Sequence, residues 1–120
     1  MSNIKFVYLY RDGGNFKNWG FCIFRNPDNL PIENIEQRLL ASFWQGSLFI
    51  AEQVGLPELF HDDYPTIDDI CFHEYVNSEL TEEDETDSFR RTISVFVDRI
   101  EYESAVGWNV FDPRDRLSSY

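Results

Sequence analysis

The fold of this chain is decided by residues 4–25, whose sequence is IKFVYLYRDGGNFKNWGFCIFR. Its two outer parts, residues 4–10 and 19–25, are rich in the aromatic and β-branched residues that are typical of strands. Between them RDGGN supplies glycines and an asparagine, which tolerate the positive φ that a chain reversal needs. We predict an antiparallel hairpin. Because both faces of its strands carry apolar side chains, we expect it to be central in a sheet and covered on more than one side.

The segment after the hairpin has a helical period. Residues 32–45 place one apolar stripe on a helix, formed by Ile32, Ile35, Leu39, Leu40 and Phe43. Pro31 suits the entry to a helix and Gly46 suits its C-terminal stop. Two apolar runs follow, SLFIAEQV at residues 47–54 and ICFHEYV at residues 70–76. We predict that both runs are strands.

Residues 88–103 fit two patterns. A helical stripe is formed by Phe89, Ile93, Phe96, Val97 and Ile100, whereas strand alternation is formed by Ile93, Val95 and Val97. We favour the helix, because acidic residues precede it and Ser88 or Thr86 can cap its N-terminus.

These elements predict an α+β fold. We expect a single domain over residues 1–120, with a mostly antiparallel sheet of about four strands and one or two helices packed on it. Residues 107–120 form a polar tail, in which Trp108, Val110 and Phe111 dock before the last residues fray.

Composition defines the class of molecule. Aromatic residues make up 17% of the 120 residues, which predicts a core of large rings and leaves open whether part of the surplus forms a homodimer surface. Cys22 and Cys71 lie in apolar surroundings and are expected to be buried free thiols. The chain shows no signal-peptide pattern and no apolar stretch near the ~20 residues that a membrane helix needs. We expect a cytoplasmic protein that does not bind membranes.

Charge is concentrated in one quarter of the chain. The formal net charge is −12, and residues 58–87 contain many acids with no lysine or arginine, while the rest of the chain is balanced. Such a field repels nucleic acid and attracts basic protein surfaces. We therefore expect no direct binding of nucleic acid.

The stretch FHDDYPTIDDICFHE contains both histidines of the chain among many carboxylates. A metal site assembled across the fold from His61, Asp63, Asp69 and His73 is the basis of an alternative function, a metal-dependent hydrolase. No local motif supports it, because Asn77 stands where a helical zinc motif that begins at His73 needs its second histidine. We expect no cofactor and no bound metal.

Other enzyme signatures are missing. The segments DGGN and QGSL lack the residues that complete a phosphate-binding loop or a nucleophile elbow. Cys71 and His73 fall on one face of an extended segment and can approach each other, but carboxylates nearby disfavour the thiolate. We expect no catalytic residue.

The function that these observations favour is that of a non-enzymatic acidic interaction protein, of inhibitor, immunity or regulatory type, which engages a basic protein surface. The predicted contact residues are Asp62, Asp63, Asp68, Asp69, Glu82, Glu83, Asp84, Glu85 and Asp87. A purely structural role is a further alternative. The loop RDGGNFKNWG is another candidate surface, on which Phe16 and Trp19 either form an aromatic patch with Arg11 and Lys17 or fasten the loop to the core.

The segments YRDGGNFKNWG, IEQRL and FIAEQVGLPELF are similar to a family of small uncharacterised bacterial proteins, with a resemblance that covers most of residues 4–76. The resemblance implies a bacterial intracellular setting. It implies no activity, cofactor or catalytic residue.

Overall fold

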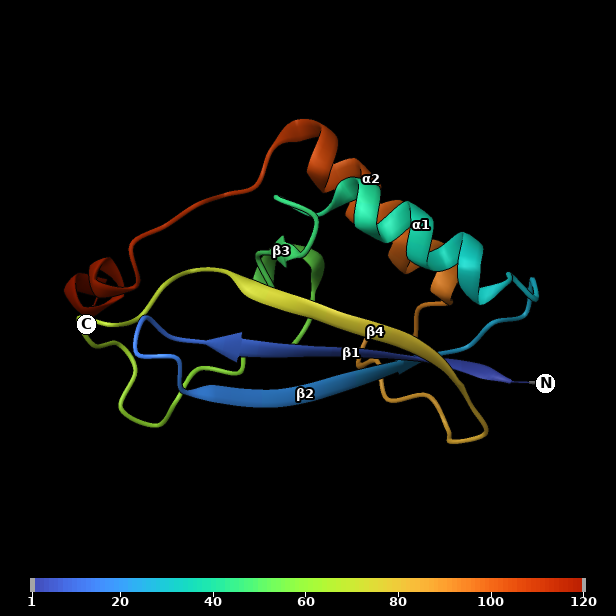
Figure 1. Cartoon of the computed structure of the whole chain (residues 1–120), viewed down its shortest axis with the longest axis horizontal. Coiled ribbons are helices and arrows are strands. Elements are labelled where there is room, and N and C mark those ends of the chain that lie inside the picture. The colour runs from blue at the N-terminus through green and yellow to red at the C-terminus, as the bar shows by residue number, and fades with distance from the viewer. Residues whose placement is uncertain (1, 120) are drawn as a thin grey trace.

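A computed structural model describes residues 2–119 and contains one four-stranded antiparallel sheet (Figure 1). The strands are β1 (Asn3–Arg11), β2 (Lys17–Phe24), β3 (Leu48–Phe49) and β4 (His73–Thr81), in the spatial order β2-β1-β4-β3. The predicted α+β fold and hairpin are confirmed, because β1 and β2 pair in continuous register from Ile4 opposite Phe24 to Arg11 opposite Lys17.

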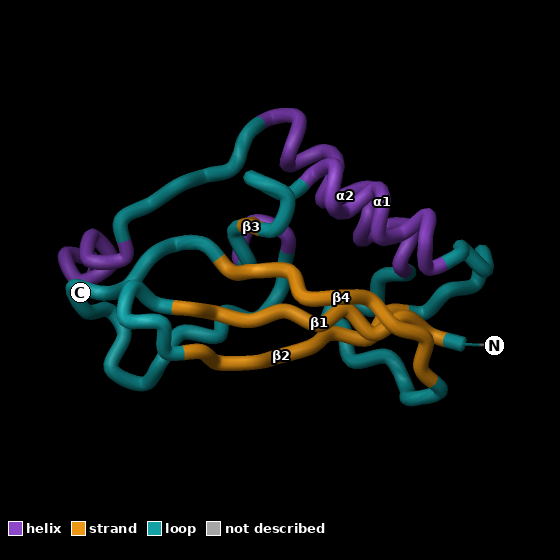
Figure 2. Tube along the Cα trace, viewed as in Figure 1, coloured by secondary structure: helices purple, strands orange, loops and turns teal. Residues whose placement is uncertain are grey.

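Two helices cover one face of this sheet. Helix α1 (Ile32–Ser42) and helix α2 (Ile93–Val106) lie side by side (Figures 1 and 2). They direct Ile35, Leu39, Phe96 and Ile100 into the core. No helix in the described part of the chain combines the length and the apolar character that crossing a bilayer requires.

Large rings fill the space between the sheet and the helices, as their number in the sequence predicts. Phe6 of β1 lies at the centre and is fully buried. Its ring contacts those of Tyr8, Phe43, Phe49, Tyr75 and Phe96. Truncating such a residue removes both its buried area and its ring contacts, so the sheet and helices are held together largely by this cluster.

The prediction of a strand over residues 47–54 is wrong for most of that segment. Only Leu48 and Phe49 pair with β4, after which the chain turns into a 3₁₀ helix, Glu52–Val54, closed by Gly55 at φ 73°. Most apolar side chains of the run are buried, although Leu48 is partly exposed. A short apolar run does not by itself distinguish a strand from a turn that packs on the core.

The strand predicted at residues 70–76 begins later and extends further, as β4. Its second half, NSELT, is polar. This half pairs with β1 on one side only, because β3 pairs with β4 only at His73 and Glu74. An edge segment of this kind needs no continuous apolar run, which is why its sequence does not indicate a buried strand.

The segment at residues 88–103 is a helix, as favoured, but it begins at Ile93. Thr92 caps it by accepting a hydrogen bond from the N–H of Val95 at 3.2 Å. The predicted caps Ser88 and Thr86 are wrong, since Thr86 instead accepts a hydrogen bond from the N–H of Ile23 at 2.8 Å. Helix α1 also ends early, at Ser42, because Phe43 is extended.

The end of the chain docks through Trp108 and Phe111 as expected, whereas Val110 is largely exposed, so its predicted docking is wrong. Trp108 packs against the core, and a 3₁₀ helix, Pro113–Ser119, follows it. The guanidinium of Arg116 lies 4.2 Å from the centre of the Phe111 ring. The prediction that the last residues fray includes residue 120, which lies outside the described residues.

The expectation that the hairpin is covered on both sides is wrong for β2. Strand β2 is at one edge of the sheet, and both helices pack on the same face. The opposite face of β2, which we call its outer face, carries exposed aromatic side chains.

Candidate partner-binding surface

A group of partly or largely exposed side chains lies on the face of the sheet that is turned away from the helices, and we call it the outer-face patch. Its members are Lys5, Val7, Trp19, Phe21, Val76, Asn77 and Glu79, which surround a shallow depression of about 560 Å³. Because Phe6 and Tyr8 point into the core, Val7 points outwards. The register places Phe21 and Asn77 on either side of it.

Two aromatic residues of β2 dominate this patch. Trp19 is 61% exposed and Phe21 is 49% exposed. The ammonium group of Lys5 lies 4.4 Å from the centre of the Phe21 ring, which is a cation–π geometry. Phe16, in the loop before β2, is also largely exposed. Exposed aromatic residues gathered on one face are typical of surfaces that bind a partner.

The main chain of β2 is also open. The N–H of Ile23 donates to Thr86 Oγ1 and its carbonyl accepts from the N–H of Thr86, so both groups point away from β1. Hydrogen-bonding direction alternates along a strand, and Trp19 and Phe21 therefore direct their N–H and C=O groups outwards in the same way. Within residues 2–119 these outward groups have no hydrogen-bond partner.

Residues 61–69, which we call the first acidic loop, lie at the start of β2. His61 Nε2 is 3.1 Å from the carbonyl oxygen of Phe16, and Asn18 Nδ2 donates to the carbonyl of Leu59 at 3.1 Å. The exposed acids of this loop are Asp62, Asp63 and Asp68.

Asp69 belongs to the interior and not to this surface. It is 3% exposed. It accepts hydrogen bonds from the hydroxyl of Tyr10 and from the N–H of Thr66. The prediction that Asp69 contacts a partner is therefore wrong, because the folded chain already uses its carboxylate.

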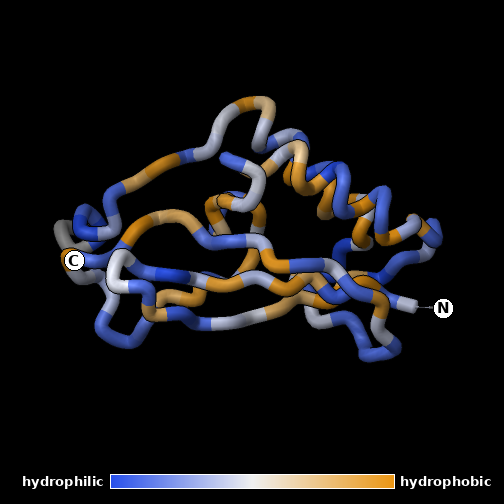
Figure 3. The backbone as a smooth tube through the Cα atoms, in the orientation of Figure 1, coloured by the Kyte–Doolittle hydropathy of each residue, from blue (hydrophilic) through white to orange (hydrophobic). Residues whose placement is uncertain are grey.

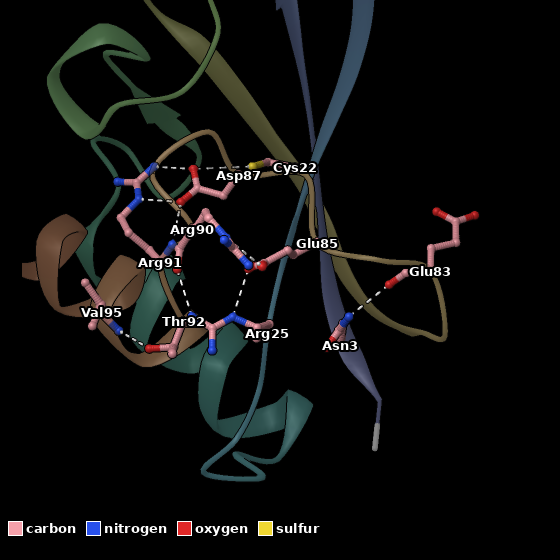
Figure 4. A network of polar contacts seen from close by, with 10 residues as sticks. All are labelled: Asn3, Cys22, Arg25, Glu83, Glu85, Asp87, Arg90, Arg91, Thr92 and Val95. Carbon is pink, nitrogen blue, oxygen red and sulfur yellow. Dashed lines mark hydrogen bonds and ion pairs between the residues drawn. The ribbon is translucent and has the colours of Figure 1, made fainter.

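Residues 82–87, which we call the second acidic loop, lie at the other end of β2 (Figure 4). The exposed acids here are Glu82, Glu83 and Asp84. The loop is held in place at its start, where Asn3 Nδ2 donates to the carbonyl of Glu83 at 2.9 Å.

Glu85 and Asp87 hold this loop to the fold. Glu85 pairs with Arg25 at 2.8 Å, and Asp87 is 4% exposed and pairs with Arg91. Burial raises the pKa of Asp87, but the hydrogen bonds from Arg91 outweigh it and lower the pKa below its ordinary value. The prediction of partner contact is wrong for Asp87 because it is buried. Glu85 already pairs with Arg25 and Arg90 of the same chain.

The acidic segment predicted from the sequence is thus divided in two. The nine residues of β4 separate the acidic loops, and at ~3.3 Å per residue they span roughly 27 Å. Figures 1 and 3 show the two hydrophilic loops at opposite ends of the sheet, both reaching towards the β2 side. The acids do not form one strip and instead flank β2 and the outer-face patch.

Ion pairing determines which charges remain available. Every arginine pairs with a carboxylate, at positions Arg11, Arg25, Arg38, Arg90, Arg91, Arg99, Arg114 and Arg116. Lys5 and Lys17 form no ion pair within the described part of the chain. None of these arginines pairs with an exposed acid of the two loops, so those acids keep their negative charge.

The residues of the alternative metal site have other partners. His73 is fully buried, and its Nε2 accepts a hydrogen bond from the N–H of Leu59 at 2.9 Å. Burial, with a smaller contribution from the charge of Arg116, lowers the pKa of His73 to about 4. Asp63 is exposed and Asp69 bonds Tyr10. Between residues 2 and 119, no three histidine, cysteine or acidic side chains are arranged to hold a metal ion.

Both cysteines are buried free thiols, as predicted. Cys22 lies 3.8 Å from Asp87, and burial together with that carboxylate raises its pKa to about 11. A thiol with a raised pKa is a weak nucleophile at neutral pH. Cys22 therefore has the properties of a packing residue.

Two further depressions are less suited to a charged partner. One of about 620 Å³ contains Arg99 and Arg116, but both guanidinium groups are already paired with carboxylates. Another of about 420 Å³ is lined by Trp44, Phe72 and Trp108, with the rings of Trp44 and Phe72 stacked at 4.8 Å. Its lining residues carry no charge, so nothing there complements the charge of a partner.

Compared with protein-family models, curated proteins and solved structures, the chain matches none of them. A function can therefore be inferred only from the chemistry of the surface itself.

Sequence reasoning named Phe16 and Trp19 but missed Phe21 and the open edge. The signal was the alternation of Lys17, Trp19 and Phe21 on one face of β2. A strand with apolar residues on both faces is also expected when the second face binds a partner.

Proposed function

We propose that the protein is a non-enzymatic interaction protein, of inhibitor, immunity or regulatory type, that binds a basic protein surface. The observation that carries this proposal is the position of the exposed aromatic residues of β2 between two exposed acidic loops. This arrangement resembles a binding interface, in which an apolar centre is surrounded by a polar rim.

The two parts of the surface have different roles. Trp19 and Phe21 supply area that is removed from water on binding, and aromatic residues of this kind commonly carry most of the affinity. The acids of the two loops speed the encounter with a basic partner and disfavour acidic ones. Binding that is both tight and selective needs both contributions.

The proposal is tested by affinity capture from the cells in which the protein is made, with the wild type and two charge-matched variants. The test variant carries Glu82→Gln, Glu83→Gln and Asp84→Asn. The control variant carries Asp28→Asn, Glu33→Gln and Asp98→Asn, which lie on the helix side of the molecule. We expect a basic protein that is recovered well at low salt and less at high salt, because salt screens exposed charges.

Recovery should fall for the test variant and stay unchanged for the control. Equal recovery from both variants, or capture of no basic protein at either salt concentration, would contradict the proposed function.

A further inference from the structure

We propose that the partner binds by strand addition: an extended segment that alternates basic and apolar residues pairs with the open edge of β2 along Lys17–Phe21. This inference rests on the proposed function and specifies how the basic partner is held. It begins with the main-chain groups of β2, which are available in a regular array.

A segment of this chain already pairs with the open edge of β2 at one residue, Ile23. Thr86 bonds both main-chain groups of Ile23, at 2.8 and 3.0 Å. This contact ends the free part of the edge on the side of the second acidic loop. On the other side, the contact of His61 in the first acidic loop with the carbonyl of Phe16 marks its limit. The outward groups of Lys17, Trp19 and Phe21 lie between these limits.

The edge carries Lys17 at its first position, which is one of the devices that usually prevent strand addition, but it lacks the others. Natural proteins protect edges with proline, with bulges or with inward-pointing charges. Strand β2 contains no proline, and its pairing with β1 has no irregularity, whereas the pairing of β1 with β4 is interrupted between Val7 and Tyr8. A regular, aromatic edge suits an added strand.

Charge decides the occupant. A strand added to β2 places alternate side chains beside Trp19 and Phe21. The Phe21 ring already holds Lys5, so a lysine or arginine of the added strand gains its cation–π contact at Trp19. Its two ends approach the exposed acids of the two loops. A second copy of this chain in an antiparallel arrangement would instead bring the first acidic loop of one copy towards the second acidic loop of the other. That juxtaposition of like charges disfavours a homodimer at this edge.

Main-chain pairing is tested with a capped nine-residue peptide that alternates lysine with valine or threonine. Two further versions are N-methylated on one or the other set of alternate residues. In calorimetry the unmodified peptide should bind, one methylated version should retain binding, and the other should lose about tenfold or more, because a strand directs only alternate N–H groups towards its neighbour. A peptide with glutamate in place of lysine should not bind.

Variants of the protein test the same edge. Trp19→Thr removes the ring and keeps the N–H, whereas Trp19→Pro removes both. We expect Trp19→Pro to weaken binding of the basic peptide by about tenfold beyond Trp19→Thr. Light scattering on the wild-type protein alone should show a monomer. A dimer that Trp19→Pro converts to monomers would overturn the proposal and assign the edge to a second copy.

Absence of binding by the unmodified basic peptide, or equal behaviour of the two methylated versions, would also overturn strand addition. The proposed function has a separate outcome. If a captured basic protein depends on Glu82, Glu83 and Asp84 but is lost equally with Trp19→Thr and Trp19→Pro, the function stands and strand addition is wrong.

Discussion

At the scale of single residues, the acids differ in what they do. Asp87 and Arg91 form a buried pair. Nε and Nη2 of Arg91 each donate a hydrogen bond of 2.9 Å to a carboxylate oxygen of Asp87. Arg91 also donates to the carbonyls of Val54 and Gly55, so the pair connects the second acidic loop to the 3₁₀ helix. It stabilises the position of the loop and is not itself exposed to a partner.

This role predicts a large effect of removing one member. Asp87→Ala should lower the free energy of unfolding by about 3 kcal/mol or more, because it leaves the charge of Arg91 largely buried and unpaired. Asp98→Ala, at the exposed pair with Arg38, should cost less than about 1 kcal/mol. Urea unfolding of the two variants measures both values, and a similar cost for both would contradict the structural role of Asp87.

His73 predicts a dependence of stability on pH. Its pKa is lowered from 6.5 to about 4 in the folded protein, so the unfolded chain takes up a proton at a higher pH than the folded protein does. The free energy of unfolding should therefore fall as the pH decreases from about 6.5 to about 4, with a contribution of up to about 1.4 kcal/mol per pH unit.

The variant His73→Gln removes the titrating group and keeps an acceptor for the N–H of Leu59. Chemical denaturation at several values between about pH 7 and about pH 5 covers much of this window. The free energy of unfolding should depend less on pH for the variant than for the wild type. Identical slopes for variant and wild type would show that His73 does not carry this dependence.

Residue-level prediction succeeded where chemistry alone decides. Buried rings and buried thiols follow from hydrophobicity. The separation of the acids did not follow, because it depends on tertiary partners. Asp87 and Arg91 have the i,i+4 spacing of a local ion pair, which was a usable signal. Asp69 bonds Tyr10 across 59 residues of sequence, and no local pattern indicates that contact.

At the scale of elements, the start of α2 is determined by Thr92 and not by the residues that the sequence favoured. Thr92→Ala should lower the free energy of unfolding by about 1 kcal/mol, because the N–H of Val95 loses its side-chain acceptor. Ser88→Ala should have little effect. Thermal unfolding of both variants provides the test, and a larger loss from Ser88→Ala would show that the helix begins earlier.

The open edge of β2 gives a second test at this scale. Trp19→Pro should cost no more than about 1 kcal/mol of folding free energy, because the N–H that it removes points to solvent. Gly20→Pro should cost about 3 kcal/mol or more, because it removes a main-chain N–H that is directed towards β1. In addition, a Cβ atom at residue 20 would lie 2.8 Å from the side chain of Leu59. Equal losses in urea unfolding would mean that the edge is not open.

Elements were predicted well where the hydrophobic period is long. The hairpin and both helices carry repeated patterns, and the structure contains them with shifted ends. The runs at residues 47–54 and 70–76 are short and apolar, and their conformation depends on which neighbour is available for pairing. Strand β3 ends after two residues because the chain leaves β4 and turns at Ala51 into the 3₁₀ helix.

At the scale of the whole molecule, whose net charge is −12, the fold places the exposed acids of the two loops at two ends of a sheet. The sequence shows that the charge is concentrated, but it cannot show that β4 separates the acids into two loops. Only the assembled sheet places exposed aromatic residues between them. The account therefore requires that the aromatic patch and the acids act on the same partner.

The most direct test of this claim compares two exposed aromatic residues on opposite sides of the molecule. Trp19 is 61% exposed on β2 and Tyr102 is 63% exposed on α2. Capture of the basic partner should fall by about tenfold with Trp19→Thr and stay at the wild-type level with Tyr102→Thr. Equal capture by the two variants, or a loss confined to Tyr102→Thr, would contradict the account.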